Sequence, residues 1–185
     1  MVKPTNGLDN TERVKENLEG LVLGQLSFAP GSARVLDDKL HAVLMYNLRL
    51  VQEHFDYEQA GNPERVIEGY TDDIVWTGYL REGGPKVVRG KQEAAENYQS
   101  IFYGTEERLF ENMWRIPNQE YVFDLSKITF TVNVPDHFTG VSPGQKAEIL
   151  LFHIFRILNG KIREEHVYEM LPGTYYQLIK PQVPV

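Results

Sequence analysis

The sequence contains no cysteine among its 185 residues. This absence excludes disulfide bonds, thiolate nucleophiles and metal sites with sulfur ligands. Chains without disulfides are typical of reducing compartments, so we expect a cytoplasmic protein.

Positively charged residues are fewer than negatively charged ones. The chain has 19 Lys and Arg residues against 26 Asp and Glu residues, which gives a net charge of -7. Such a balance provides no electrostatic attraction to nucleic-acid phosphates or to anionic lipids. We therefore expect neither nucleic acid nor membrane as a partner.

Long hydrophobic runs are also absent. The longest apolar run, Ile149–Phe155, is interrupted by His153 and is far shorter than the roughly 18 residues that a membrane-spanning helix needs. Leu21–Gly24 is too short for the core of an export signal. Hydrophobic residues nevertheless make up 42% of the chain, enough for a sizeable buried core.

The order of predicted elements indicates one α+β domain over residues 37–172. An extension, residues 1–36, precedes this domain, and a proline-containing tail, residues 173–185, follows it. Apolar spacing, caps and turn residues predict helices over 37–60, 63–70 and 90–103, and strands over 73–79, 87–88, 128–134, 147–157 and 161–170. Helices segregated from long antiparallel strands are typical of α+β folds. We expect three helices against a curved antiparallel sheet, forming a cone whose open mouth is a small-molecule site.

Four stretches carry a resemblance to a known family. They are Tyr70–Trp76, Arg89–Ala94, Asp136–Gly140 and the pair Phe155–Ile162 with Glu165–Tyr168. In this order they resemble the nuclear transport factor 2-like superfamily, and within it the SnoaL-like polyketide cyclases, over roughly residues 40–171. The resemblance implies the cystatin-like cone fold with one internal pocket. It does not imply one reaction, because this fold carries several chemistries and also non-catalytic binders.

The sequence departs from the family at its known catalytic positions. The polyketide cyclases have an acid/base Asp at the position of Val167, and ketosteroid isomerase has its proton-abstracting Asp at the position of Gly78. The trio of two Asp and one Arg that limonene epoxide hydrolases need cannot be located.

His153 is the first candidate for chemistry, because it interrupts an apolar strand. Buried imidazoles need a hydrogen-bond partner or a wet cavity, and a pocket His can act as acid or base near neutral pH. A two-residue turn at Asn159-Gly160 would place His153 opposite His166, whereas a three-residue loop would place it opposite Glu165. We favour the second, which gives a hydrogen-bonded His153–Glu165 dyad with a raised His153 pKa. The alternative is a core His beside a surface Glu.

Further polar candidates lie nearby. His54 matches the oxyanion-hole Tyr of ketosteroid isomerase by the resemblance, and otherwise is a residue at the edge of the core. Glu169 shares a strand face with Glu165 and Val167, near the pocket or on its solvated rim. A metal held by His54, His153 and Glu165 is conceivable, but no spacing demands it, and we expect no metal and no cofactor. His137 is expected on a surface loop.

Aromatic residues are expected to shape the pocket for a small apolar or cyclic ligand. They are Trp76, Tyr79, Tyr98, Phe102 and Trp114, with Val167 beside them. Simple core packing is the alternative role for each.

Two functional hypotheses follow. One is an isomerase, cyclase or lyase that transfers protons on a carbonyl compound without a cofactor, using His153 and Glu165. The other is a non-catalytic ligand-binding or scaffold protein. We also expect a homodimer, formed through an apolar patch of Phe152, Ile154, Ile162 and Tyr168 on the convex face of the sheet.

Overall fold

The computed structural model describes residues 38–79, 84–135, 141–170 and 177–178. The predicted N-terminal extension, the loop with His137 and most of the C-terminal tail lie outside these residues. The helices are α2 (Asp38–Gln59), α3 (Pro63–Glu68) and α4 (Gly90–Gly104). The strands are β1 (Tyr70–Tyr79), β2 (Pro85–Arg89), β3 (Thr105–Pro117), β4 (Tyr121–Val132), β5 (Lys146–Leu158), β6 (Lys161–Glu169) and β7 (Gln177–Leu178).

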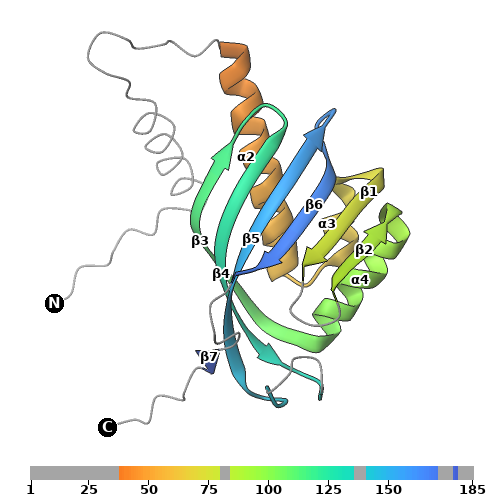
Figure 1. Cartoon of the computed structure of the whole chain (residues 1–185), viewed down its shortest axis with the longest axis vertical. Helices are drawn as coiled ribbons and strands as arrows, with labels where there is room; N and C mark the ends of the chain where they lie inside the picture. Colours follow the sequence, from red (N-terminus) through yellow and green to blue (C-terminus); the bar gives the residue numbers. More distant parts are fainter. Residues whose placement is uncertain (1–37, 80–83, 136–140, 171–176, 179–185) are drawn as a thin grey trace, which may run out of the picture. The chain divides into compact units, whose positions relative to one another are not determined.

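One curved, unclosed sheet organises the domain (Figure 1). Its strands lie in the order β2-β1-β6-β5-β4-β3, and β7 pairs with the start of β5. The α+β class is confirmed, but the sheet is mixed, because β1 and β6 run parallel while the other pairs are antiparallel. The parallel pair follows from the chain path, in which β1 comes early and the last long strand inserts beside it.

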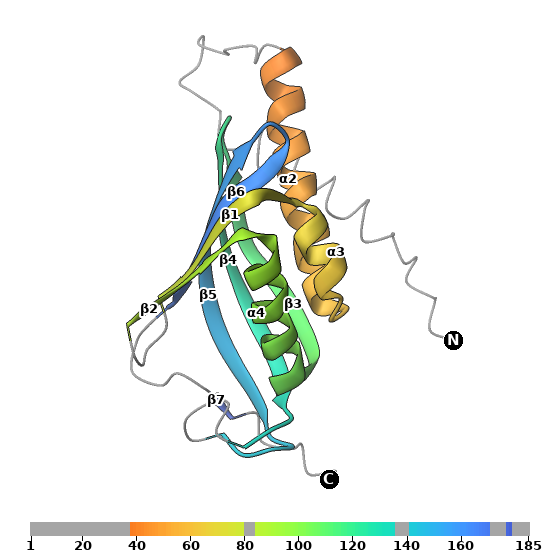
Figure 2. The ribbon, with the colours of Figure 1, turned by 90° about the vertical axis from the view of Figure 1, so that its right-hand side faces the viewer.

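The three helices lie on the concave side of the sheet (Figure 2). Helix α2 buries the apolar residues that its spacing predicted, with Leu48, Val51 and Phe55 at most 2% exposed. Asn62 caps α3 by accepting a hydrogen bond from the backbone of Arg65, as its position before Pro63 predicted. No helix in the described part of the chain is long and apolar enough to cross a lipid bilayer.

The β5–β6 hairpin differs from both predicted registers. Its turn has two residues, Asn159 and Gly160, with positive φ angles of 52° and 74°. The register then shifts by one residue, because Ile157 pairs with Ile162 but Arg156 pairs with Glu164. Residue 163 is thus the extra residue of a β-bulge, which makes further pairs advance by one position.

The bulge residue, Arg163, contacts the neighbouring strand β1. The Arg163 guanidinium donates to the backbone oxygen of Asp73 at 2.6 Å and forms an ion pair with its carboxylate at 3.0 Å. Because the bulge shifts the register by one residue, His153 lies opposite Val167, and Phe155 lies opposite Glu165. The predicted pairing of His153 with Glu165 is wrong, although both side chains face the concave side.

Candidate active site

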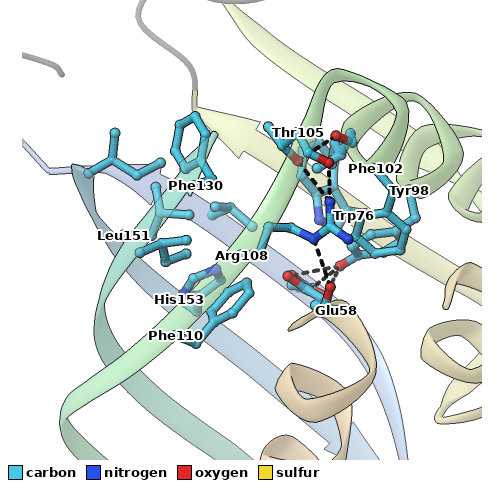
Figure 3. A pocket seen from close by; sticks show the side chains of 15 residues that line it. Glu58, Trp76, Tyr98, Phe102, Thr105, Arg108, Phe110, Phe130, Leu151 and His153 are labelled. Atoms are coloured by element: carbon cyan, nitrogen blue, oxygen red, sulfur yellow. Dashed lines mark hydrogen bonds between the residues drawn. The ribbon is translucent and has the colours of Figure 1, made fainter. Parts of the chain in front are cut away.

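A cavity of about 100 Å³ lies between the concave face of the sheet and helix α4 (Figure 3). Most of its wall is apolar and aromatic: Trp76, Tyr98, Ile101, Phe102, Phe110, Ile128, Phe130, Ile149, Leu151 and Val167. Five polar side chains complete the wall: Glu58, Thr105, Arg108, His153 and Glu165. An apolar cavity with a few convergent polar groups is the usual form of a small-molecule site.

A charged cluster lies at one end of this cavity. His54 and Glu58 are one turn apart on α2, and Glu165 faces them from β6. The Nε2 atom of His54 is 2.7 Å from Glu58 Oε1 and 3.5 Å from Glu165 Oε2. His54 is 3% exposed and Glu165 is 1% exposed. One imidazole therefore lies between two buried carboxylates.

Two tyrosines complete the cluster. The hydroxyl of Tyr70 donates a short hydrogen bond to Glu165 Oε2. The hydroxyl of Tyr98 lies 2.9 Å from Glu58 Oε1, 3.3 Å from both oxygens of Glu165 and 2.8 Å from the Tyr70 hydroxyl. Since Tyr98 has one hydroxyl hydrogen, it can donate to one of these acceptors at a time. Glu165 thus keeps lone pairs that are available to a further proton.

The cluster fixes the protonation of its members. Burial alone would lower the pKa of His54, but the charges of Glu165 and Glu58 and their hydrogen bonds outweigh it and raise this pKa to about 10. Burial alone would raise the pKa of Glu165, but His54 and the Tyr70 hydrogen bond hold it below its usual range. Burial, followed by the two carboxylate charges, raises the pKa of Tyr70 and Tyr98 well above 10. At neutral pH the cluster therefore holds an imidazolium at His54 beside an ionised Glu165, with Glu58 as a second hydrogen-bond partner of His54.

The same three residues are also the set that comes closest to a metal site in the described chain. Ligand atoms of His54, Glu58 and Glu165 lie within 4.8 Å of one another. However, a metal-bound His normally donates its other ring N–H to an acceptor, and His54 Nδ1 is buried without one. The 2.7 Å contact between His54 and Glu58 is a hydrogen-bond distance. The arrangement therefore fits a proton between His54 and Glu58 better than a metal ion.

His153 lies apart from this cluster, in an aromatic environment. Its ring stacks on Phe155 at 5.7 Å and meets the edge of Phe55 at 5.1 Å. Its Nδ1 is 3.8 Å from Asp124 Oδ1, too far for a hydrogen bond, and has no partner among the described residues. Burial lowers the pKa of His153 more than Asp124 and the glutamates raise it. The predicted dyad with a raised His153 pKa is therefore wrong, because Phe155 occupies the position opposite Glu165.

A second buried polar group was missed at the sequence level. Asp124 on β4 forms an ion pair with Arg115 Nε at 2.7 Å and accepts a hydrogen bond from Ser126 at 2.6 Å. Arg115 also donates to Gln52 on α2 at 2.9 Å. The alternation along β4 could have indicated it. Asp124 and Ser126 occupy every second position before Ile128, so all three side chains point to the same, inner face of the sheet. Arg115 has one Asp partner among the described residues, not the two that an epoxide hydrolase trio requires.

Arg108 was missed too, because it lies at an irregularity of β3. The pairing of β3 with β4 shifts between Glu106 and Leu109, and Glu107 has a positive φ of 49°. The Arg108 side chain donates to the Glu58 carbonyl oxygen at 3.0 Å and to Thr105, and it lies over the Phe102 ring at 4.6 Å. It caps the last turn of α2 and forms part of the cavity wall.

The predicted ligand-binding residues divide into two groups. Trp76, Tyr98, Phe102 and Val167 line the cavity. Tyr79 and Trp114 do not, since Tyr79 stacks on Tyr168 at 4.3 Å and Trp114 contacts Phe152 at 5.8 Å. Both lie on the opposite face because β-strand side chains alternate.

Glu169 is half-buried and pairs with Leu151, but it does not line the cavity. Val167 and Gly78, the two positions where relatives have an Asp, lie side by side in the register of β1 and β6.

Solved structures with the same fold are numerous. A phenazine biosynthesis-related protein from Pseudomonas aeruginosa has a TM-score of 0.60 at 16% identity, over 80% of this chain and 99% of its own. A protein assigned to the SnoaL-like polyketide cyclases, from Jannaschia sp. CCS1, has a TM-score of 0.59 at 18% identity. The match covers 74% of this chain and 90% of that protein. An epoxide hydrolase of M. tuberculosis, similar to limonene epoxide hydrolase, has a TM-score of 0.54 at 13% identity. The match covers 69% of this chain and 84% of that protein. At these identities the likeness shows the fold alone.

The sequence itself places the chain in a family. No curated protein matches it in sequence. Residues 51–165, well over half of the chain, match the family described as the SnoaL-like domain. This segment contains all three residues of the buried charged cluster, His54, Glu58 and Glu165. The chain therefore belongs to the SnoaL-like domain family.

Proposed function

We propose that this protein is an isomerase, cyclase or lyase that transfers a proton on a small carbonyl-containing molecule, with Glu165 as the general base. One observation carries the proposal: Glu165 is a buried carboxylate on the wall of an apolar cavity, held by an imidazolium and by tyrosine hydroxyls. Side chains held in this way keep their position during reaction, which favours proton transfer.

The chemistry needs no further group to be balanced. Glu165 takes a proton from the carbon next to a carbonyl, and the electrons of the broken C–H bond move into an enolate. Return of the proton to another carbon gives isomerisation. Expulsion of a β-substituent gives elimination, and attack of the enolate carbon on an internal electrophile gives cyclisation. In these two cases Glu165 passes its proton to the expelled substituent or to the anion formed from the electrophile. His54 stays protonated and Tyr70 keeps its hydroxyl hydrogen, so both stabilise the ionised Glu165.

A non-catalytic binding protein is the second candidate. It is favoured by the apolar residues at the two positions where relatives have an Asp, and by the modest volume of the cavity. Ligand binding without proton transfer would identify this alternative.

Exchange of α-hydrogens in D₂O tests the proposal, with cyclohexanone and 2-tetralone as probes observed by NMR. We expect the wild-type protein to accelerate exchange over buffer, and Glu165→Gln to lose at least about 10²-fold of that acceleration. Glu164→Gln is the matched control, because Glu164 is the adjacent residue but forms its ion pair with Arg156 away from the cavity. Equal exchange by both variants would refute the role of Glu165.

A further inference from the structure

Trp76 is the direct neighbour of the proposed base. In the parallel pairing of β1 and β6, Trp76 is the Cα partner of Glu165. Paired residues on adjacent strands point their side chains to the same face of a sheet. Both side chains contribute to the cavity wall (Figure 3 labels Trp76 there).

The indole of Trp76 has an unused hydrogen-bond donor. Its Nε1 is buried, and the whole residue is 4% exposed, but no acceptor lies within reach in the described part of the chain. Buried polar groups in proteins nearly always have a partner, so an unpaired donor calls for an explanation. Trp76 belongs to the buried core cluster that also contains Ile74, Val88 and Val167, whose side chains offer no acceptor. Since Trp76 lines the cavity together with Glu165, a ligand bound there can supply this acceptor.

The geometry points to Trp76 as the donor to the substrate's carbonyl oxygen, while Glu165 removes a proton from the adjacent carbon. This inference rests on the proposed function and names its substrate class: a neutral cyclic ketone or similar carbonyl compound with a hydrocarbon body. The oxygen gains negative charge as the enolate forms, and a fixed N–H donor then binds it more strongly. Trp76 does not give up its hydrogen, because the transferred proton is on Glu165.

Two features favour a neutral carbonyl over a carboxylate. The carboxyl groups of Glu58 and Glu165 already lie on the cavity wall. The nearest cation on the wall, Arg108, is engaged by backbone oxygens, and its Nη2 packs against Gly61. An anionic ligand would therefore meet repulsion without a free cation.

The test observes the indole hydrogen directly. The chain has two tryptophans, Trp76 and Trp114, so a protein labelled with ¹⁵N-tryptophan gives two indole N–H signals, which Trp76→Phe assigns. The labelled protein is titrated with cyclohexanone and, separately, with methylenecyclohexane, which has the same shape but no acceptor oxygen. Trp114, on the opposite face of the sheet, is the internal control.

We expect cyclohexanone to move the Trp76 indole hydrogen signal downfield in a saturable manner, and methylenecyclohexane not to do so. Trp76→Phe should weaken cyclohexanone binding roughly fivefold to tenfold and leave methylenecyclohexane binding unchanged, since it removes one hydrogen bond. Equal shifts with the two probes, an unmoved Trp76 signal, or no binding of cyclohexanone would each overturn the inference.

The Glu165→Gln variant separates this inference from the proposed function. It should retain the Trp76 shift, because binding of the oxygen requires no proton transfer. A Trp76 shift without hydrogen exchange in the wild-type protein would refute the proposed function and leave the donor role of Trp76 standing. Exchange without a Trp76 shift would refute the donor role of Trp76 and leave the proposed function standing.

Discussion

His54 on α2 and His153 on β5 have pKa values that their surroundings shift in opposite directions. His54 has two carboxylates within 3.5 Å, whereas His153 lies between aromatic rings with its nearest carboxylate oxygen 3.8 Å away. We predict that NMR titration finds the His54 ring charged from pH 6 to 8 and the His153 ring titrating below its usual value of 6.5. A His54 ring that titrates near pH 6.5 would contradict this assignment.

The raised pKa of His54 also predicts a pH-dependent stability. Since the folded pKa of about 10 exceeds the unfolded value of 6.5, its stabilisation is fully present below pH 6.5 and is lost as pH rises through about 10. The free energy of unfolding of the wild type should fall relative to His54→Gln in this window, by up to about 1.4 kcal/mol per pH unit. Urea titrations at pH 6.5, 8 and 9.5 would measure it. A constant difference between the two proteins would show that the imidazolium is absent.

At the residue scale, the sequence allowed the site to be predicted only in part. His153 is predicted because it interrupts an apolar strand, Glu165 because one hairpin register places it opposite His153, and His54 because the resemblance matches it to the oxyanion-hole Tyr of ketosteroid isomerase. The sequence does not predict which of these side chains lie together. Their positions depend on the β-bulge at Arg163, and no pattern in the sequence indicates a bulge there. The sequence predicts Tyr70 as the last residue of a helix, whereas the structure places it at the start of β1 with its hydroxyl on Glu165.

At the scale of elements, the C-terminus of α2 is fixed by Gly61 and Arg108. Gly61 has a positive φ of 67°, and a Cβ there would collide with Nη2 of Arg108. Gly144 has a φ of 81° but open space around it.

We predict that Gly144→Ala costs about 1 kcal/mol from backbone strain alone. Gly61→Ala should cost about 2–3 kcal/mol, because it also displaces the Arg108 hydrogen bonds to Glu58 and Thr105. Urea unfolding of the two variants compares them, and equal costs would show that Arg108 does not depend on Gly61.

The helices and most strands were predictable because their signals are local. The apolar spacing of α2, the cap at Asn62 and the turn at Asn159-Gly160 each fix a short segment by themselves. Strand β3 was not delimited, since its inward and outward positions are irregular around Glu107. The parallel pairing of β1 with β6 is non-local, and no pattern along the chain records it.

At the scale of the whole molecule, a row of apolar side chains crosses the outer face of the sheet. In register these residues are Tyr79, Tyr168, Phe152, Leu125 and Trp114. Ile162, which was expected in this patch, is instead fully buried in the core, because the bulge at residue 163 reverses the alternation. The outer row is the remaining candidate for a self-association surface.

We propose that the protein is a homodimer formed through this row. Analytical ultracentrifugation at micromolar concentration should find twice the 21.3 kDa mass of one chain, and Tyr168→Glu should reduce it to one. Tyr103→Glu is the control, because Tyr103 is 74% exposed on α4, outside this row. A single 21.3 kDa species in the wild type would contradict the proposal.

The pH profile of α-hydrogen exchange tests the role of Glu165 most directly. Because the pKa of Glu165 is held low and that of His54 is raised to about 10, Glu165 should be an ionised base throughout neutral pH. Exchange of 2-tetralone should therefore be constant from pH 6 to 9 after subtraction of the buffer rate, equal in wild type and Glu164→Gln, and absent in Glu165→Gln. A rate that follows a group titrating near pH 6.5, or that survives in Glu165→Gln, would contradict the account.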